Sequence, residues 1–525
     1  MLMHSYDNFF GLIAVMAALN STLRSVSVRT KLSKDRILAA SSYFSAEICV
    51  RVIVLRIVFS FFVVVSVPRR ALKMKILLVF SLFIVGTLAN KVGNQSPAGP
   101  KKHMVCYYDS TSFIKEGLGK LIIDDLEPAL QFCDYLVYGY AGIERDSHKA
   151  VSLNQNLDLD LGKGLYRTVT RLKRKYPALK VLLGLGGDKD IETGEDAKDL
   201  PNKYLELLEN PVGRTRFLNT VYALVKTYGF DGLDIAWQFP KNKPKKVHSG
   251  IGSLWKGFKK VFSGDHIVDE KSEEHKEQFT ALLRDVKNEF RPDNLLLSAT
   301  VLPNVNSSLF YDVPAIVNYL DFVNLAAFDF YTPERNPELA DLPAPLYELP
   351  ERNPQFNVNF QVQYWLRNNC PASKLNVGVP AFGRAWKLTD GSGDTGVPPV
   401  GNVENEAPAG PHTQIKGLYS WPEVCALLPN TNNAYGKGAN LALTKVADPT
   451  RRTGNYAYRT DEKSSGHGLW VAYDDPDTAA EKAGYVRQFN LGGVALFDLS
   501  FDDFRGSCTG DKYPVLRAIK YRLVN

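Results

Sequence analysis

The sequence predicts an α/β protein, a (β/α)8 TIM barrel with a small α+β insertion domain after strand seven. After residue 100, short runs of β-branched and hydrophobic residues alternate with amphipathic stretches, which is typical of parallel βαβ units. Eight such runs complete the count of a closed barrel. An open, doubly wound sheet is the alternative, because the spacing of strands does not determine their order in a sheet.

The elements follow one another at regular intervals. The predicted strands are 103–109, 134–141, 179–186, 230–236, 294–301, 321–329, 374–382 and 492–499. The predicted helices between them are 162–175, 211–228, 272–290, 357–368 and 476–490. The segment 388–470 interrupts this rhythm; it is rich in Gly, Pro and Asn and too long for a plain loop. We expect it to be the insertion domain on the C-terminal face of the barrel, which then comprises 90–387 and 471–525.

Composition and charge exclude several classes of protein. The 525 residues are 45% hydrophobic and 23% charged, which excludes a disordered chain, a collagen and a coiled coil. The net charge of +7 arises at the N-terminus, because residues 1–89 hold 11 basic and 3 acidic residues, whereas 90–525 hold 52 and 53. The main part of the chain has no overall basic field, so we expect no nucleic-acid partner.

The N-terminal region has the pattern of a secretory leader. Lys73, Met74 and Lys75 precede an apolar run over 76–85 and small residues over 86–89. This order predicts a signal peptide over 74–89, a non-native or isoform extension over 1–73, and a secreted, extracellular protein without stable membrane insertion. The rival interpretation is a signal anchor over 48–67, although each of its two arginines would cost about 2.5–3.5 kcal/mol near the centre of a bilayer.

Five cysteines follow the leader, and they suit two disulfides and one free thiol in an oxidising compartment. Their spacing alone does not select the pairs. These cysteines are Cys106, Cys133, Cys370, Cys425 and Cys508. The sequence Asn306-Ser307-Ser308 is an acceptor for N-glycosylation, so Asn306 is predicted to carry a glycan.

A lysine-rich segment follows the fourth predicted strand, over 240–264. It has three interleaved aromatic residues and no Asp or Glu. One interpretation is a solvated loop, and the other is a patch that binds a sulfated glycan, a phospholipid headgroup or an acidic receptor. The partner-binding candidates are Lys241, Lys243, Lys245, Lys246, Lys256, Lys259 and Lys260.

The fourth strand carries the most informative motif. Alternation along the strand places Asp234, Ala236 and Gln238 on one face, preceded by Asp231, and we expect this set at the mouth of the barrel. Residues 231–240 resemble the strand-four signature of glycoside hydrolase family 18, the chitinases, which reads Asp-Gly-x-Asp-x-Asp-Trp-Glu-Tyr-Pro. Here Ala236, Gln238 and Phe239 replace the third Asp, the Glu and the Tyr.

The resemblance implies a barrel without catalysis. In that family the Glu protonates the glycosidic oxygen while the N-acetyl carbonyl of the substrate attacks the anomeric carbon, oriented by the neighbouring Asp. Gln238 has no proton to transfer, and loss of a positioned acid lowers a rate by about 10²–10⁴-fold. Ala236 lacks the orienting carboxylate. We therefore expect a pseudo-enzyme without cofactor or metal, in which Asp231 and Asp234 bond to the backbone and to neighbouring strands.

The resemblance extends from about residue 103 to 508. The segment 180–187 is similar to the strand-three motif of the family but lacks the Trp that follows it. Phe328 stands where the strand-six motif has a Tyr, before the retained Asp329, and Phe497 replaces the Trp of strand eight. The ligand-binding candidates are Trp237, Gln238, Phe328, Asp329 and Phe497. Phe328 and Phe497 are expected to be core residues at the barrel mouth more than platforms on which a sugar stacks.

Within the chitinase-like group, Ala-Trp-Gln-Phe-Pro followed by the lysine-rich segment resembles the imaginal disc growth factors of insects. That resemblance implies a secreted glycoprotein that promotes cell proliferation, polarisation and motility with insulin and organises extracellular matrix or cuticle. It implies a cell-surface receptor or a matrix component as partner, with a glycan among the candidates. It also implies disulfides Cys106–Cys133 and Cys425–Cys508, with Cys370 free. The alternatives are a chitin-binding lectin and a residual glycosidase.

Overall fold

The structure is a computed structural model, and it describes residues 101–191, 200–242, 269–389, 397–401, 403–429, 442–460 and 468–525. The signal peptide predicted over 74–89, the extension over 1–73 and the rival anchor over 48–67 lie outside these residues. Six of the seven lysines of the lysine-rich segment also lie outside them. Lys241 is the exception.

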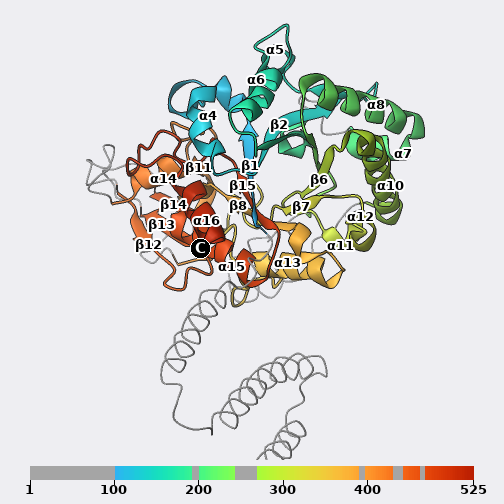
Figure 1. Cartoon of the computed structure of the whole chain (residues 1–525). Helices are drawn as coiled ribbons and strands as arrows, with labels where there is room; N and C mark the ends of the chain where they lie inside the picture. Colours follow the sequence, from blue (N-terminus) through green and yellow to red (C-terminus); the bar gives the residue numbers. More distant parts are fainter. Residues whose placement is uncertain are drawn as a thin grey trace, which may run out of the picture. The chain divides into compact units, whose positions relative to one another are not determined.

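Eight parallel strands close into a barrel (Figure 1). Strand β1 pairs with both β15 and β2, which closes the ring, so the barrel prediction is confirmed and the open sheet is excluded. The short β3, Ala150–Ser152, adds to β2 in the antiparallel sense. The barrel strands are β1 His103–Asp109, β2 Tyr135–Ile143, β4 Lys180–Gly186, β5 Gly232–Ala236, β6 Leu296–Val301, β7 Phe322–Leu325, β8 Leu375–Pro380 and β15 Gly493–Phe497.

Helices connect the strands around the outside of the barrel. Local signals explain their bounds: α8, Pro211–Tyr228, begins after Asn210, whose side chain accepts from Gly213 N, and ends at Gly229 with φ +75°. Both α8 and α10 have the predicted bounds. The other helices are α4 Ile123–Leu130, α5 Gln155–Asp158, α6 Leu165–Arg171, α7 Lys203–Glu209, α10 Ser272–Phe290, α11 Ser307–Phe310, α12 Val313–Ile316, α13 Val358–Arg367, α15 Pro476–Gln488 and α16 Pro514–Val524. Among the described residues, no helix has the length and apolar character needed to cross a membrane.

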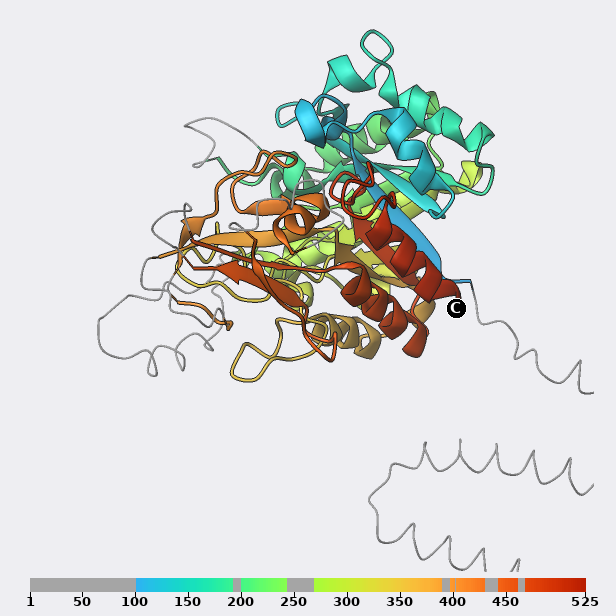
Figure 2. The same cartoon turned by 90° about the vertical axis from the view of Figure 1, so that its left-hand side faces the viewer.

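A second, antiparallel sheet lies between β8 and β15 in the chain, and Figure 2 shows its strands in orange and red beside the barrel. It extends from Phe382 to Tyr473, because the chain turns from β8 into the new sheet without a long loop. The inserted sheet therefore begins six residues earlier and ends three residues later in the sequence than the predicted segment 388–470. Its elements are β9 Phe382–Leu388, β10 Val403–Glu406, β11 Leu418–Ser420, helix α14 Trp421–Leu427, β12 Thr444–Val446, β13 Asn455–Arg459 and β14 Gly468–Tyr473.

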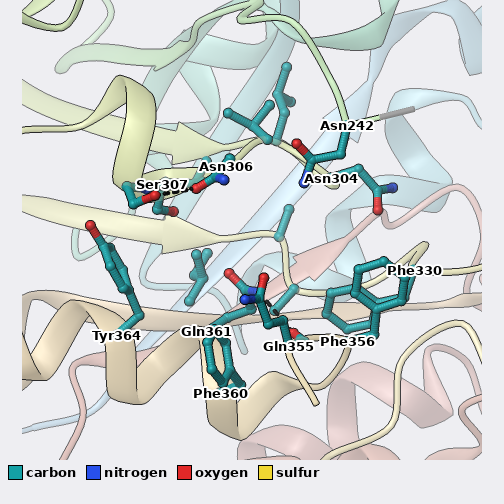
Figure 3. A pocket seen from close by; sticks show the side chains of 17 residues that line it. Asn242, Asn304, Asn306, Ser307, Phe330, Gln355, Phe356, Phe360, Gln361 and Tyr364 are labelled. Carbon is teal, nitrogen blue, oxygen red and sulfur yellow. Dashed lines mark hydrogen bonds between the residues drawn. The ribbon is translucent and has the colours of Figure 1, made fainter. Parts of the chain in front are cut away.

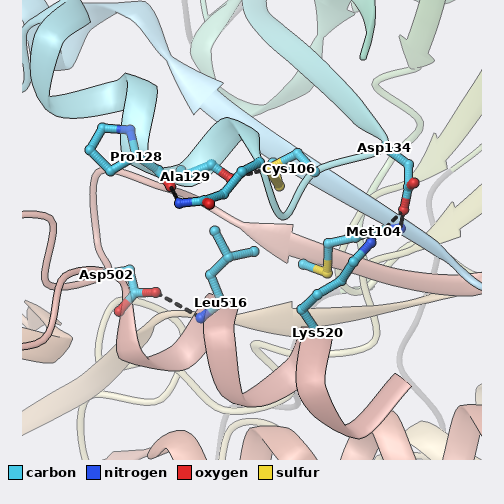
Figure 4. The surroundings of a disulfide bond; sticks show 10 residues. Met104, Cys106, Pro128, Ala129, Asp134, Asp502, Leu516 and Lys520 are labelled. Carbon is cyan, nitrogen blue, oxygen red and sulfur yellow. Dashed lines mark hydrogen bonds and ion pairs between the residues drawn. A yellow bond between two sulfur atoms is a disulfide. The ribbon is translucent and has the colours of Figure 1, made fainter. Parts of the chain in front are cut away.

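Two disulfides hold distant parts of the chain together. Cys106 of β1 pairs with Cys133 after α4 (Figure 4), and Cys425 of α14 pairs with Cys508 after β15. These are the pairs that the family resemblance implies. Cys370 is free and buried, and burial raises the pKa of its thiol to about 12. Closing loops of this length stabilises a fold by roughly 3–5 kcal/mol per bond in the chain-entropy model.

Candidate functional site

Gln238, the residue that the motif predicts in place of a catalytic acid, lies two residues beyond the end of β5. Its side-chain Nε2 donates to the carbonyl oxygens of Gly187 and Asp190, the latter at 3.1 Å. Its own backbone oxygen accepts from Asn202 Nδ2 at 2.8 Å. The side chain at this position therefore fastens the loop that follows β4. An unprotonated carboxylate could not make these two bonds, because it has no hydrogen to donate.

Ala236 ends β5 and is 2% exposed, so a methyl group stands where the signature has its third carboxylate. Two residues earlier, Asp234 is fully buried and each of its oxygens accepts two hydrogen bonds. The donors are Ser298 Oγ at 2.5 Å, Asn324 Nδ2 at 3.2 Å, Thr300 Oγ1 at 2.7 Å and Tyr107 OH at 3.0 Å. Burial raises the pKa of Asp234, and these bonds offset part of the shift. Because a carboxylate offers about four acceptor positions, Asp234 has none left for a ligand.

Asp231 lies at the other end of the strand. It precedes β5 at the N-terminal end of the barrel, accepts from Val181 N at 2.8 Å and pairs with Lys173 at 3.0 Å. The expectation that it faces the mouth was wrong, because the five residues of β5 separate it from that end. Its bonds to the neighbouring strand are those expected of a structural carboxylate.

Asp329 follows β7 at the mouth and has a left-handed backbone with φ +56°. Both of its carboxylate oxygens accept from Arg384 of β9, at 2.7 Å from Nε and 2.6 Å from Nη2. Burial would lower the pKa of Arg384, but Asp329 raises it above the usual value. This bidentate pair joins the barrel to the antiparallel sheet.

The aromatic candidates are largely packed against one another. Phe497 stacks on Tyr107 with ring centroids 4.1 Å apart, and Phe328 meets the edge of Phe497 at 5.2 Å. Trp237 points outward instead and is 0% exposed; its ring packs edge-on against Tyr204 at 4.9 Å. The ring of Trp237 therefore offers no surface to a ligand in this arrangement.

The structure also reveals a charged cluster at the mouth that the sequence reasoning missed. Lys189 Nζ lies 2.8 Å from Asp109 at the end of β1, and Asp498 follows β15. Burial and the neighbouring Asp109 raise the pKa of Asp498 to about 6. Burial would also raise the pKa of Asp109, but Lys189 holds it below its usual value. All three residues lie at or just beyond the carboxyl ends of predicted strands, and this position could have identified them from the sequence.

Lys241 is the described member of the lysine-rich segment, and it is already paired. Its Nζ lies 2.6 Å from Asp188, and its backbone forms an isolated bridge with Val305. Lys243, Lys245, Lys246, Lys256, Lys259 and Lys260 lie outside the described residues. At the described end of the segment, the positive charge is balanced by the loop that follows β4.

The barrel is closed and parallel and carries an inserted antiparallel sheet, and its strand-four motif keeps one fully buried carboxylate, Asp234. This combination defines a chitinase-like protein. Residues 103–502 match the model of glycosyl hydrolases family 18. The chain belongs to this family and, within it, to the chitinase-like imaginal disk growth factors.

Curated relatives cover most of the chain. It is 78% identical over 451 residues to imaginal disk growth factor 6 of Drosophila melanogaster, which covers 86% of this chain and 99% of that protein. It is 62% identical to chitinase-like protein Idgf4 of Glossina morsitans morsitans, over 86% of this chain and all of the relative. These matches span the barrel together with its inserted sheet.

Solved structures include both an active and an inactive relative. The group IV chitinase of Ostrinia furnacalis is 29% identical with a TM-score of 0.65, over 81% of this chain and all of that one. Human YKL-39, described as a pseudo-chitinase with retained chitooligosaccharide binding, is 25% identical with a TM-score of 0.61. That match covers 81% of this chain and all of YKL-39. The shared barrel thus occurs both in a chitinase and in a protein described as a pseudo-chitinase.

Proposed function

We propose that this protein is a secreted, catalytically inactive chitinase-like glycoprotein that acts as a growth factor. It promotes cell proliferation, polarisation and motility together with insulin, and it takes part in organising extracellular matrix or cuticle. One observation carries the loss of catalysis: the side chain at the position of the acid is an amide that donates two hydrogen bonds to the β4 loop.

Three other carboxylates near the mouth are already engaged within the fold. Asp234 uses its four acceptor positions inside the barrel, and Asp329 is held by Arg384. Asp109 is held by Lys189. A fourth, Asp498, whose pKa burial raises to about 6, accepts from Ser500 N at 2.7 Å and from Ser500 Oγ at 2.5 Å. Loss of a positioned acid alone removes about 3–5 kcal/mol of transition-state stabilisation. With Ala236 in place of the orienting carboxylate, the reacting acetamido group also lacks support.

The names of the curated relatives support the signalling role, and the matches to them extend over nearly the whole length of each relative. Its partner is a cell-surface receptor or a matrix component such as a glycan, and the lysine-rich segment is the candidate contact surface.

Two assays on purified protein from insect-cell medium test the proposal. We expect no sugar release from a chitin oligosaccharide, and little release from Gln238→Glu, because Ala236 still leaves the acetamido group unsupported. We expect imaginal disc cells in culture to proliferate more with insulin plus the protein than with insulin alone. Hydrolysis by the unmutated protein would overturn the inactive assignment, and an unchanged cell count would overturn the growth-factor role.

A second candidate is a chitin lectin, which YKL-39 favours through its described chitooligosaccharide binding. Against it stands Phe497, because Tyr107 covers one face of the ring at 4.1 Å. Retention on a chitin column separates the two functions. A lectin is retained and loses retention in Phe497→Ala, whereas a growth factor whose partner is not chitin elutes unretained.

A further inference from the structure

A cavity of about 260 Å³ lies at the rim of the barrel, between the ends of β6 and β7 and helix α13 (Figure 3). None of the signature residues of strand four lines it, and no charged side chain does among the described residues. Its volume is just below the roughly 300–1,000 Å³ of sites for drug-sized ligands, so it suits a group of monosaccharide size. The lining combines amide side chains with aromatic rings, which fits a neutral polar occupant.

Asn306 is part of this lining and is the N-cap of α11. Its Oδ1 accepts from Ser308 N at 2.9 Å and from Ser308 Oγ at 2.7 Å. Its Nδ2 donates to no acceptor among the described residues. Nδ2 is the atom that N-glycosylation modifies, so a sugar attached there leaves both capping bonds intact.

The opposite wall is one face of α13. Figure 3 shows Phe360, Gln361 and Tyr364 across the cavity from Asn306. Residues at these spacings share a helix face, and Phe360 and Tyr364 are only half-buried. Aromatic rings pack on the apolar faces of sugars, and the Gln361 amide can pair with hydroxyl or acetamido groups.

A buried acceptor adds to this lining. Asn242 Oδ1 is buried and receives no hydrogen bond among the described residues. A buried polar atom without a partner costs roughly 1–3 kcal/mol, and a hydroxyl or amide donor from an occupant would remove that cost.

We propose that an N-linked glycan on Asn306 folds back into this cavity, with its first N-acetylglucosamine unit packed against Phe360 and Tyr364. The inference rests on entry into the secretory pathway, as proposed above. There a lipid-linked oligosaccharide diphosphate is the donor. A bond forms between Asn306 Nδ2 and C1 of the first sugar, the bond from C1 to the diphosphate oxygen breaks, and the amide loses one proton.

The full chain expressed in insect cells tests the attachment. Glycopeptides are analysed in the medium and in the membrane fraction. A secreted chain and an anchored chain both pass through the lumen of the secretory pathway, where the sugar is added. Ser308→Ala removes the acceptor motif and should abolish the glycan, whereas Ser308→Thr should keep it. An unmodified Asn306 in both fractions overturns the inference. Absence of the chain from the medium overturns secretion instead.

The proposed position of the glycan in the cavity, here called its seat, is tested by the rate at which an amidase removes the glycan from the native protein. We expect removal from the parent to be at least tenfold slower than after denaturation. Phe360→Ala and Tyr364→Ala should each speed native removal at least threefold. Tyr521→Ala, at a side chain that is 54% exposed on α16, is the matched control and should change nothing. Equal rates in parent and cavity variants overturn the proposed seat.

A second measurement needs no change in the cavity wall. Asn306→Asp keeps the capping oxygen but cannot be glycosylated. We expect backbone hydrogen exchange over 355–364 to be at least threefold faster in Asn306→Asp than in the glycosylated parent, with no change in α8. Identical exchange in both proteins overturns the seat even if the cavity variants fail to fold.

Discussion

An amide in place of a carboxylate at position 238 reverses the direction of the hydrogen bonds that the side chain can make. Gln238 Nε2 donates to two carbonyl oxygens, whereas an ionised Glu would place a charged acceptor against them. We expect Gln238→Glu to lower the free energy of unfolding by about 1–3 kcal/mol at pH 7. The loss should shrink at pH 4.5, because a protonated Glu can donate one bond.

Urea unfolding at the two pH values measures this effect. Gln131→Glu is the matched control, because Gln131 also donates to a carbonyl, that of Pro128 at 3.1 Å, but is exposed. Equal losses in the two variants at pH 7 would mean that the bonds of Gln238 do not stabilise the β4 loop.

Asp498 makes stability depend on pH. Its pKa is about 6 in the fold because of burial and Asp109, against about 3.8 for a free aspartate side chain. Between these values the folded state binds the proton and the unfolded chain does not, so this group lowers stability as the pH rises. Asp498→Asn should therefore gain stability relative to the parent from pH 4 to pH 7, by up to about 3 kcal/mol.

Thermal unfolding across that range measures the difference between parent and Asp498→Asn. The exposed Asp146→Asn serves as control and should run parallel to the parent. A constant difference between parent and Asp498→Asn from pH 4 to pH 7 would contradict the raised pKa.

At the scale of elements, the pair of Asp329 and Arg384 holds strand β9 against the end of β7. Arg384→Met leaves a carboxylate that is 8% exposed without its partner, so we expect a loss of about 3–5 kcal/mol. Arg384→Lys keeps the charge but not both bonds and should lose less. Combining Arg384→Met with Asp329→Asn should recover part of the loss.

Guanidinium unfolding of these three variants provides the measurement. A loss below about 1 kcal/mol in Arg384→Met, or no recovery in the double variant, would show that the pair does not couple the two sheets.

The lysine-rich segment is expected to contact the partner. Lys241 is set aside, because it already pairs with Asp188. Replacing Lys243, Lys245 and Lys246 with Ser should weaken binding to heparin at least tenfold at low salt, and the difference should shrink as salt rises.

A control for total charge uses three exposed lysines from other parts of the chain, each changed to Ser: Lys120, Lys163 and Lys416. Elution from a heparin column across a salt series compares the two triple variants. If both elute with the parent, the segment is a solvated loop.

At the scale of the whole molecule, cleavage of the predicted signal peptide determines whether the protein is secreted into the medium. The small residues Thr87 and Ala89 fit a cleavage site behind a sufficient apolar run, so the secreted chain should begin near Asn90. N-terminal sequencing of protein from the medium measures this. Peptides from residues 1–73 on that protein would support the anchored alternative instead.

Local pattern was enough to place the eight barrel strands and five of the helices, but it missed others, such as α4 and α16. The bounds 103–109, 211–228 and 272–290 match β1, α8 and α10, because alternation and capping depend on residues a few positions apart. The motif also predicts the loss of the acid at Gln238 and of the carboxylate at Ala236, and both stay predictions. The pairing of the cysteines needed the family resemblance, since spacing does not select partners.

Tertiary structure alone decided which distant groups meet. Closure of the barrel brings Lys189 to Asp109, and the turn from β8 into β9 brings Arg384 to Asp329. It also directs the amide of Gln238 toward the β4 loop and places Asp231 at the opposite end of the barrel. These contacts depend on strand order and on the path of the inserted sheet. Sequence periodicity predicts neither the strand order nor the path of the inserted sheet, because it indicates only which face of its own element a residue occupies.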